Sequence, residues 1–360
     1  MEYANAKVFR LKPDQKINEK IVDAEIRKYN TKGELSTVIV NNNYTIVGSP
    51  EAYIAGRKLK LPYLASARIK TKRNEASHFP SAILLELTNR CNLLCNMCPR
   101  NQLTRKEQDM DFNIFKKVID EISYHKIEGL WLFNLGESLL HPQFFEMLAY
   151  VNKYPRIHPL WLSTNGLKLT KDTTEKLLNS GLDFLNISLN AMDRETYKQI
   201  SPKSDFDLVI ENIQHFLKRK DQLQVRKPFL RIQMVDQPAV HSQIPGFLDE
   251  WGSKADIINV NQLERFDGQP EIPTNKDIKT INNLEPCKRI DRGFLYIYSN
   301  NKVNLCGVDF NCVNMIGDVS TMTIEKIWNS KEYKDLYTAI KNRKFETIPQ
   351  CYNCNDRGLT

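Results

Sequence analysis

The sequence predicts an α/β protein with a parallel sheet, and two observations lead to this fold class. Between residues 81 and about 265, six short apolar runs recur, and amphipathic helical patterns separate them. Repeated strand–helix units imply parallel strands that are joined by crossover helices. The strand candidates are Ile83–Leu87, Gly129–Phe133, Leu160–Ser163, Phe184–Ser188, Leu230–Val235 and Ile257–Val260.

The helices between these strands are indicated by apolar residues at helical spacing and by signals at their ends. Asp111 suits the N-cap of the first helix, and the segment Thr173–Ser180 stops at Gly181. Functional groups are expected at the carboxyl ends of the strands. The repeated apolar positions are Phe115, Val118, Ile119 and Ile122, and later Val209, Ile213, Phe216 and Leu217.

The first 67 residues predict a small α/β domain, and the polar, basic residues 68–80 predict a linker. Thr37–Val40 and Tyr44–Val47 are strand candidates that flank a turn of asparagines. Helices are predicted on either side of them, at Ile17–Tyr29 and from about Pro50 to Lys60.

This order of elements resembles the ParB/sulfiredoxin family. In that family the second strand leads into a Gly-x-x-Arg loop that binds phosphate. Here Gly48–Glu51 stands at that place without the arginine. The resemblance therefore implies a recognition or docking module.

Cys91, Cys95 and Cys98 form a C-x3-C-x2-C motif directly after the first predicted strand. Three thiolates in one tight loop can bind three irons of a [4Fe–4S] cube and leave the fourth iron open. A cluster that only transfers electrons takes four thiolates. A structural zinc site is the alternative, although zinc requires a fourth protein ligand.

This motif, at the end of the apolar run Ile83–Leu87, resembles the radical S-adenosylmethionine (SAM) superfamily. The resemblance implies a partial (β/α)6 TIM-like barrel over residues 81–265. It also implies that SAM binds the open iron of a [4Fe–4S] cluster. One electron then cleaves SAM to a 5′-deoxyadenosyl radical, which abstracts hydrogen from a substrate.

Residues at the strand ends match further family positions. Gly136 and Glu137 are similar to the end of the family's Gly-Gly-Glu motif, whose carboxylate holds the SAM ammonium, although Leu135 replaces the first glycine. The run Ser163-Thr-Asn-Gly166 resembles an element that contacts the methionyl and ribose groups. The implied SAM-binding residues are Met97, Gly136, Glu137, Ser163, Asn165, Ser188, Asn190 and Gln233, with Gln233 alternatively a structural residue.

A second cysteine set follows in residues 266–360. Four of its members have the order C-x18-C-x44-C-x2-C, and a predicted hairpin, Phe294–Tyr298 with Lys302–Cys306, delivers the second of them. This segment resembles the SPASM, or twitch, extension of radical SAM enzymes. The resemblance implies one auxiliary [4Fe–4S] cluster, with a zinc site as the alternative. Its ligands would be Cys287, Cys306, Cys351 and Cys354.

Cys312 is the remaining cysteine of this segment. Three roles stay open for it: a substitute cluster ligand, an inert thiol, or a hydrogen donor to a substrate radical, as in radical SAM epimerases.

Composition limits the remaining choices. The chain has 360 residues, a net charge of +8 and 41% hydrophobic residues, without an apolar run near the ~20 residues that a membrane span needs. Eight cysteines without an export signal predict a reduced, cytoplasmic protein. The mild basicity permits a phosphorylated or nucleic-acid partner, but a lysine-rich solvated surface is the favoured explanation.

Several functions remain open at this point. The favoured one is the oxidation or epimerisation of a sugar-like or nucleotide-linked small molecule, with dehydrogenation as the natural net reaction and a flavodoxin or ferredoxin as reductant. Maturation of a ribosomal peptide is the second, and nucleic-acid modification is the third. A non-catalytic iron–sulfur or zinc scaffold is the alternative outside enzymes.

Overall fold

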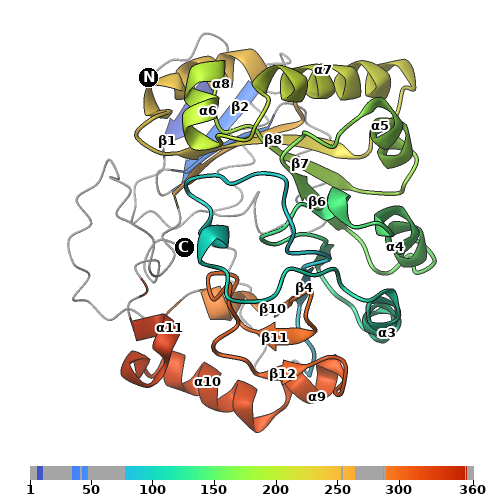
Figure 1. Ribbon diagram of the computed structural model, residues 1–360, viewed down its shortest axis with the longest axis vertical. Coiled ribbons are helices and arrows are strands. Elements are labelled where there is room, and N and C mark those ends of the chain that lie inside the picture. The colour runs from blue at the N-terminus through green and yellow to red at the C-terminus, as the bar shows by residue number, and fades with distance from the viewer. Residues whose placement is uncertain are drawn as a thin grey trace.

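The centre of the fold is a run of six parallel strands that lie side by side in chain order. All six predicted strands, and their parallel arrangement, are confirmed. They are β4 (Ala82–Leu85), β5 (Gly129–Trp131), β6 (Leu160–Thr164), β7 (Phe184–Ser188), β8 (Phe229–Asp236) and β9 (Ile257–Gln262). Together with their helices they form the predicted partial barrel (Figure 1).

The computed structural model describes residues 78–252, 254–263, 287, 289–352 and 354, and it describes three N-terminal strands by their backbone. The domain boundaries predicted above lie partly outside these ranges and stay predictions. None of the helices in the described ranges has the length and apolarity that crossing a bilayer requires.

Crossover helices follow the strands along the outer side of the sheet (Figure 1). The predicted N-cap at Asp111 is confirmed, because its carboxylate accepts hydrogen bonds from the backbone N–H groups of Asn113 and Ile114 at 2.8 and 3.1 Å. The helices are α3 (Phe112–Ser123), α4 (Phe144–Val151), α5 (Lys171–Leu178), α6 (Arg194–Ile200), α7 (Phe206–Gln222) and α8 (Ile244–Trp251). Short 3-10 turns lie at η1 (Pro99–Gln102), η2 (Ser138–Leu140) and η3 (His241–Gln243).

The helix α5 begins and ends two residues earlier than predicted. The hydroxyl of Thr170 caps it by accepting a hydrogen bond from the backbone N–H of Thr173 at 3.2 Å. Gly181 follows the helix with a φ of +72°, a left-handed conformation that glycine adopts without strain. The predicted glycine turn is therefore present, but it lies three residues beyond Leu178, the last residue of α5.

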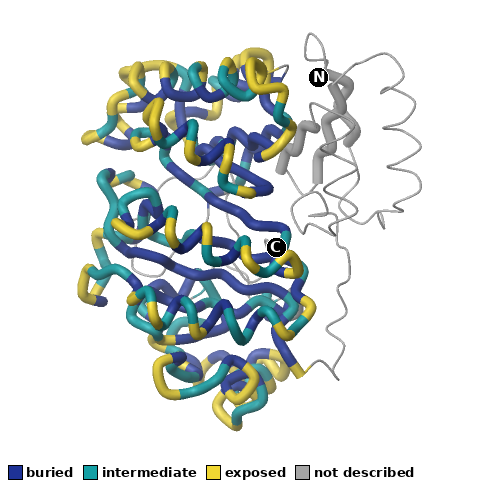
Figure 2. The backbone as a smooth tube through the Cα atoms, turned by 90° about the vertical axis from the view of Figure 1, so that its right-hand side faces the viewer, coloured by how far each residue is buried: buried dark blue, intermediate teal, exposed yellow. Residues whose placement is uncertain are grey.

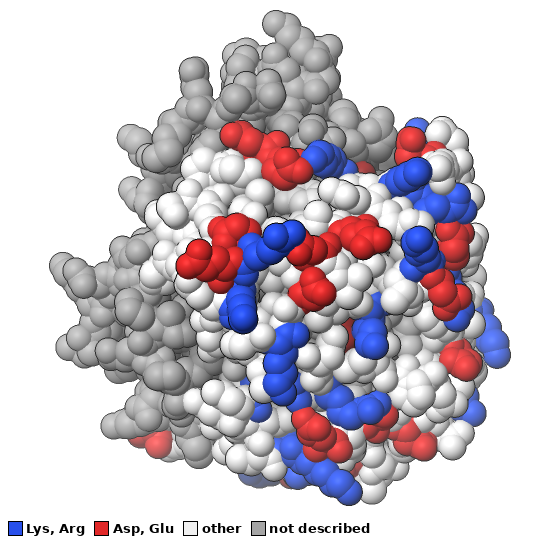
Figure 3. Space-filling model, turned by 45° about the horizontal axis from the view of Figure 1, so that its top comes forward, with Lys and Arg blue, Asp and Glu red and all other residues white. Residues whose placement is uncertain are grey.

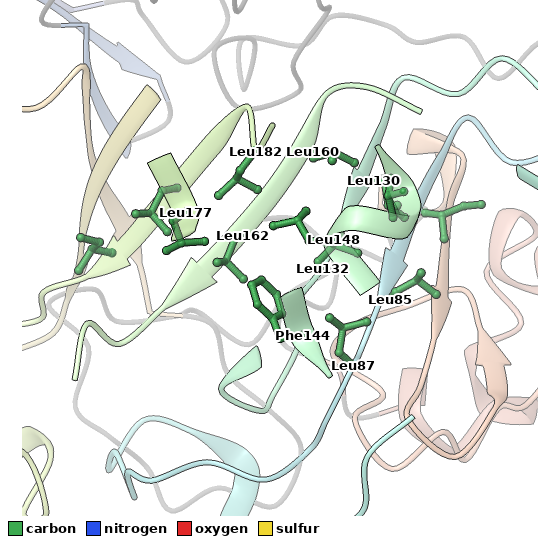
Figure 4. Packing of buried hydrophobic residues seen from close by; sticks show 14 of the residues in the cluster. Leu85, Leu87, Leu130, Leu132, Phe144, Leu148, Leu160, Leu162, Leu177 and Leu182 are labelled. Atoms are coloured by element: carbon green, nitrogen blue, oxygen red, sulfur yellow. The ribbon is translucent and has the colours of Figure 1, made fainter. Parts of the chain in front are cut away.

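The two faces of the sheet have different compositions. The outer face packs leucines against the helices, as Figure 4 shows for Leu85, Leu130 and Leu162 beside Phe144 and Leu148 of α4. Figure 2 shows the strands as buried paths inside a shell of partly exposed helical turns. The inner face carries a second apolar cluster, which contains no helix residue: Ala82, Leu84, Trp131, Trp161, Phe184, Phe229 and Ile257.

Aromatic rings form a row across this inner face. Trp131, Trp161, Phe184 and Phe229 are register partners on β5 to β8, and neighbouring ring centroids are 6.2, 4.0 and 5.3 Å apart. Side chains two residues apart on a strand lie on the same face, and on β6, β7 and β8 the next position of this face is polar: Ser163, Asn186 and Arg231. The row therefore closes the barrel below a polar layer.

Three N-terminal strands extend the sheet beyond β9. The predicted pair of strands is confirmed as β2 (Leu35–Val40) and β3 (Asn43–Val47), which are antiparallel, and β3 pairs with β9. Strand β1 (Ala6–Arg10), which was not predicted, pairs parallel to β2. The helices predicted at 17–29 and 50–60, and the loop 48–51, lie outside the described residues.

The C-terminal segment adds strands at the opposite edge. Strand β10 (Phe294–Ile297) pairs parallel to β4 and forms the predicted hairpin with β11 (Lys302–Asn304), which in turn pairs with β12 (Gly317–Asp318). Asn301 turns this hairpin with a φ of +69°, which asparagine tolerates better than most residues.

Two helices follow β12, α9 (Ile324–Trp328) and α10 (Lys331–Lys341). They are separate because the hydroxyl of Ser330 caps α10 by accepting from the backbone N–H of Tyr333 at 3.1 Å. The remaining short elements are η4 (Arg289–Arg292), η5 (Phe345–Thr347) and α11 (Pro349–Tyr352).

Asp183 carries a large share of the polar contacts at the base of β6 and β7. Its buried carboxylate accepts hydrogen bonds from the ring Nδ1 of His158 at 2.6 Å, from the backbone N–H of Leu160 at 2.8 Å and from Lys227 Nζ at 2.5 Å. Burial opposes its ionisation, but these donors, His158 first, lower the pKa of Asp183 below its ordinary value.

We expect Asp183→Asn to lower the free energy of unfolding at pH 7 by about 2 kcal/mol, since hydrogen bonds to a charged group are lost. The folded-state pKa lies below the unfolded one, so this stabilisation is complete above about pH 4 and disappears as the pH falls through the folded value. Urea unfolding at several pH values measures it. Asp172→Asn, at an exposed position, serves as the control, and equal losses for both variants would contradict the prediction.

Candidate active site

The loop that carries Cys91, Cys95 and Cys98 leaves the carboxyl end of β4. The backbone N–H of Cys98 donates to the carbonyl of Cys95 at 3.0 Å, and the Cys95 thiol donates to Ser201 Oγ at 3.3 Å. Burial raises the pKa of all three thiols, and burial together with the charges of Cys95 and Cys91 raises that of Cys98 to about 12. The loop thus brings the three thiols within electrostatic reach of one another.

This environment fits an iron–sulfur cluster. Three thiolates in a partly buried loop repel each other, and a bound metal group supplies the positive charge that balances them. Within the described residues, no group of three histidine, cysteine or carboxylate side chains is arranged to hold a single metal ion. In a cube each thiolate binds a different iron, so the sulfur atoms need not converge on one point.

Gly136 packs directly on the segment that leads from β4 into this loop. A Cβ atom at Gly136 would lie 1.9 Å from the carbonyl oxygen of Thr88 and 2.9 Å from that of Arg90. The next residue, Glu137, donates its backbone N–H to the same Arg90 carbonyl at 2.8 Å. The backbone of Gly136 therefore approaches this segment closely, and this contact ties the loop after β5 to the cysteine loop.

The Glu137 carboxylate lies between the loops that follow β5 and β6. It accepts hydrogen bonds from the backbone N–H groups of Asn165 at 2.8 Å and Leu139 at 3.2 Å. Burial raises the pKa of Glu137 to about 7, although these hydrogen bonds, with one from Thr164, oppose the shift. A buried carboxyl group in this state gains from a cationic partner such as an ammonium group.

Asn165 connects the remaining parts of this region. Its side-chain amide donates to Asn92 Oδ1 at 2.8 Å and lies 3.8 Å from the sulfur of Cys91. The turn is completed by Gly166, with a φ of +82°, whose carbonyl accepts from Asn212 Nδ2 at 2.9 Å. Asn92 and Asn212 were not among the predicted residues. Asn92 could have been found from its place beside Cys91, but nothing in the sequence connects Asn212 with this turn.

A polar row crosses the inner face of the barrel above the aromatic row. Ser163, Asn186 and Arg231 are register partners on β6, β7 and β8. Arg231 Nε donates to Asn186 Oδ1 at 2.6 Å, and Asn186 Nδ2 donates to Ser163 Oγ at 2.8 Å. Asn186 and Arg231 were not predicted, although each lies two residues before a predicted one, Ser188 or Gln233, on the same strand face.

The other predicted SAM residues lie nearby along β7 and β8 or in the cysteine loop. Ser188 is the register partner of Gln233. Asn190 is buried, and its Oδ1 accepts from the backbone N–H of Val235 at 3.1 Å, so one end of its amide already has a structural partner. Met97 is buried in the core between the sheet and the helices.

The C-terminal cysteines Cys287, Cys306, Cys351 and Cys354 form a second group. After burial, the charges of the other three are the largest causes that raise the pKa of Cys351. Cys287 and Cys351 pack against one apolar cluster, which consists of Ile290, Ile340, Phe345 and Ile348. Four partly buried thiols at one place fit an auxiliary cluster with four protein ligands.

Cys312 lies in a different environment. It is buried, has a φ of +55° and donates its backbone N–H to the Asp309 carbonyl at 2.9 Å. Burial, and then the charge of Asp309, raise its pKa to about 12, while Arg105 and Lys302 oppose the shift. This thiol therefore stays protonated at neutral pH.

Glu86 and Arg105 join the two cysteine-bearing parts of the chain. Their buried ion pair is bidentate, at 2.7 and 2.9 Å, and Arg105 Nε donates to the carbonyl of Phe310 at 2.7 Å. Ser299 Oγ donates to Glu86 at 2.9 Å, and the guanidinium carbon lies 4.4 Å from the ring centroid of Tyr298. We call these five residues the domain junction.

A three-cysteine loop at the end of the first parallel strand, a buried glutamate beside it and a second cysteine group define an iron–sulfur enzyme with a partial barrel. The radical SAM superfamily matches residues 85–222, and the SPASM iron–sulfur cluster-binding domain matches residues 287–355. The chain is therefore a member of the radical SAM superfamily with a C-terminal SPASM domain. Its cofactors are SAM, a [4Fe–4S] cluster and the auxiliary iron–sulfur clusters that a SPASM domain binds.

Several characterised proteins resemble the chain. The tungsten-containing aldehyde ferredoxin oxidoreductase cofactor-modifying protein of Pyrococcus furiosus is 27% identical over 164 residues, 45% of this chain and 46% of that protein. The GTP 3′,8-cyclase of Chlorobaculum tepidum is 25% identical over 51% of this chain and 54% of the cyclase. The chain thus spans about half the length of these curated relatives.

Among solved structures, Streptococcus suis SuiB bound to its precursor peptide SuiA has a TM-score of 0.61 at 16% identity and covers 78% of this chain and 72% of SuiB. At this identity the likeness establishes the shared fold. The matching families begin at residue 85, so the resemblance of the N-terminal segment to ParB stays a prediction.

Proposed function

We propose that this radical SAM enzyme acts on a sugar-like or nucleotide-linked small molecule and that its net reaction is an oxidation or an epimerisation. The observation that carries the proposal is the polar inner face of the barrel, where amide, hydroxyl and guanidinium groups follow one another on neighbouring strands: Ser163, Asn186, Ser188, Arg231, Gln233 and Asn259. Donors and acceptors of this kind suit a substrate with many hydroxyl groups. The similarity to a GTP 3′,8-cyclase is the reason for including a nucleotide-linked substrate.

We propose that Cys91, Cys95 and Cys98 hold the SAM-binding cluster and that the four C-terminal thiols hold one auxiliary cluster. When bound, the first cluster would supply the electron for the reductive cleavage of SAM, and SAM would supply the radical chemistry that removes a hydrogen from the substrate. Glu137 would accept the SAM ammonium group, in an orientation that the backbone N–H groups of Asn165 and Leu139 already fix. Ser163, Ser188 and Gln233 would contact the remainder of SAM or the substrate, and the backbone at Met97 would meet the adenine.

The proposed cluster assignment predicts the iron content of the anaerobically reconstituted protein. We expect about eight irons per chain, which fall to about four in the variant with Cys91, Cys95 and Cys98 changed to alanine, because each cube contributes four. Iron, zinc and sulfide analysis measures this. About four irons with retained zinc in the wild type would instead make the C-terminal group a zinc site.

The substrate class is tested by isotope transfer. The enzyme, with dithionite or a flavodoxin-type reductant, is incubated with deuterated cyclitols, amino sugars or nucleotide sugars, and 5′-deoxyadenosine is analysed by mass spectrometry. Deuterium in 5′-deoxyadenosine from one of these compounds supports the proposal. Deuterium transfer from a peptide alone would overturn it in favour of a peptide maturase, which the SuiB fold permits. If the wild type cleaves no more SAM than Cys95→Ala does, because neither protein cleaves any, the protein is a non-catalytic iron–sulfur or zinc scaffold.

Cys312 separates the two net reactions. An epimerase needs a hydrogen donor, and a buried thiol that stays protonated is suited to this role. If the reaction is an epimerisation that uses it, Cys312→Ala retains 5′-deoxyadenosine formation but loses solvent deuterium in the product. A dehydrogenase keeps its product in this variant.

Modification of nucleic acid is the less favoured alternative. On the face of the molecule in Figure 3, acidic and basic side chains of the described residues alternate without a basic stripe. We further propose a cytoplasmic location, because none of the eight cysteines forms a disulfide, which suits a reducing compartment.

A further inference from the structure

Arg100 reaches back from η1 over the loop that carries the three cysteines. Its Nη1 donates to the carbonyl of Cys91 and to that of Leu93, both at 3.2 Å. Its Nη2 forms an ion pair with Glu107, which is largely exposed, whereas only 8% of the Arg100 side chain is exposed. A buried cation is thus bound to the backbone between the first and second cysteines.

The charge of Arg100 lies close to the cysteine loop. Its guanidinium is bound to the backbone of Cys91, and Arg100 stands two residues beyond Cys98. A positive charge beside a cluster favours the reduced, more negative state of that cluster.

One donor of Arg100 is not used within the part of the chain that the structure describes. Arg100 Nε is buried, and it has no hydrogen-bond partner among the described residues. A buried donor without a partner costs about 1–3 kcal/mol, so such an atom is expected where a bound group provides the acceptor. Sulfur atoms of a cluster, and of its thiolate ligands, accept hydrogen bonds of this kind.

We propose that Arg100 is a positioning residue for the SAM-binding cluster. Its Nη1 holds the cysteine loop closed, its Nε donates a hydrogen bond to a cluster or thiolate sulfur, and its charge makes the cluster easier to reduce. This inference rests on the proposed cluster at Cys91, Cys95 and Cys98. Charge and hydrogen bonds to sulfur set the reduction potential of a cluster.

The test is a redox titration of the reconstituted full chain, followed by electron paramagnetic resonance. The signal that changes on addition of SAM belongs to the open cluster, so the auxiliary cluster does not confuse the measurement. Arg100→Gln is expected to shift this signal to a more negative potential by at least 59 mV, which is a tenfold smaller equilibrium constant for one-electron reduction. Arg100→Lys keeps the charge and is expected to recover most of this shift, while it loses iron to a chelator faster than the wild type.

Arg219→Gln is the control, because it removes one positive charge from an outer helix, where Arg219 pairs with Glu175. An unchanged potential and unchanged iron retention in Arg100→Gln would overturn the proposal. If Arg100→Gln does not load iron, the decision passes to Arg100→Lys, where wild-type chelator resistance would overturn the loop-closing role. A wild type without any SAM-sensitive signal would instead overturn the proposed function itself.

Discussion

Arg105→Ala is expected to destabilise the protein by about 3–5 kcal/mol, the usual cost of breaking a buried ion pair by removing one partner. The Glu86 side chain is 0% exposed, and its carboxylate would lose both hydrogen bonds from the guanidinium. The carbonyl of Phe310 would lose its donor in the same step. Urea unfolding of the anaerobically prepared protein, followed by circular dichroism, measures the loss.

The matched control is Arg194→Ala. The Arg194–Asp207 pair has a closest distance of 2.6 Å, comparable to that of the buried pair, but its side chains are 78% and 57% exposed. Solvent screens such a pair, so little change is expected. Equal losses in the two variants would contradict the prediction. A double variant, Glu86→Leu with Arg105→Met, is expected to be more stable than Arg105→Ala, because it leaves no unpaired buried charge.

The position of this pair gives the prediction a second consequence. The pair binds Ser299 and Phe310, which lie on either side of Cys306 in the sequence. Its own members belong to the barrel, because Glu86 follows β4 and Arg105 lies seven residues beyond Cys98. Loss of the domain junction is therefore expected to lower the iron content of the SPASM domain as well as the stability. Iron analysis of Arg105→Ala checks this.

The central fold was predictable because its signals are local. Each strand from β4 to β9 is a short apolar run, and caps such as Asp111 mark helix starts in the sequence itself. The strand β1 was missed because Ala6–Arg10 alternates small, charged and apolar residues without a sustained pattern. Its pairing with β2, outside the central strands, depends on tertiary contact that no local rule describes.

The candidate site was predictable only where a motif has fixed spacing. The two cysteine groups and Gly136-Glu137 are such motifs, and the structure brings each set together. The contact of Arg231 with Asn186, and of Asn186 with Ser163, depends on the register of three strands. These residues are spread over 69 positions of the sequence. The pairing of Glu86 with Arg105 and Ser299 spans two domains. Contacts of this kind follow from the assembled fold, not from a pattern of neighbouring residues.

Gly136→Ala is the second change with a large expected effect. The added Cβ would lie 1.9 Å from the carbonyl oxygen of Thr88 and 2.7 Å from its carbonyl carbon, and both are backbone atoms that no side-chain rotation can move. Either the end of β5 or the strand that leads to Cys91 must therefore shift. Overpacking of this kind costs about 1–3 kcal/mol, which corresponds to roughly a 5- to 150-fold loss when the strain falls on a binding site.

We expect this strain to fall on SAM binding, because Glu137 is the next residue and donates its backbone N–H to Arg90 at 2.8 Å, on the same displaced segment. Equilibrium binding of SAM to the reconstituted enzyme measures the change, with iron content as a check that the cluster is retained. Gly246→Ala in α8 is the matched control, since nothing lies within 4 Å of its added Cβ. There alanine replaces glycine inside an open helix turn, which favours the folded state slightly and leaves SAM binding unchanged. Wild-type SAM affinity in Gly136→Ala would show that the contact between β5 and the cysteine loop does not position Glu137.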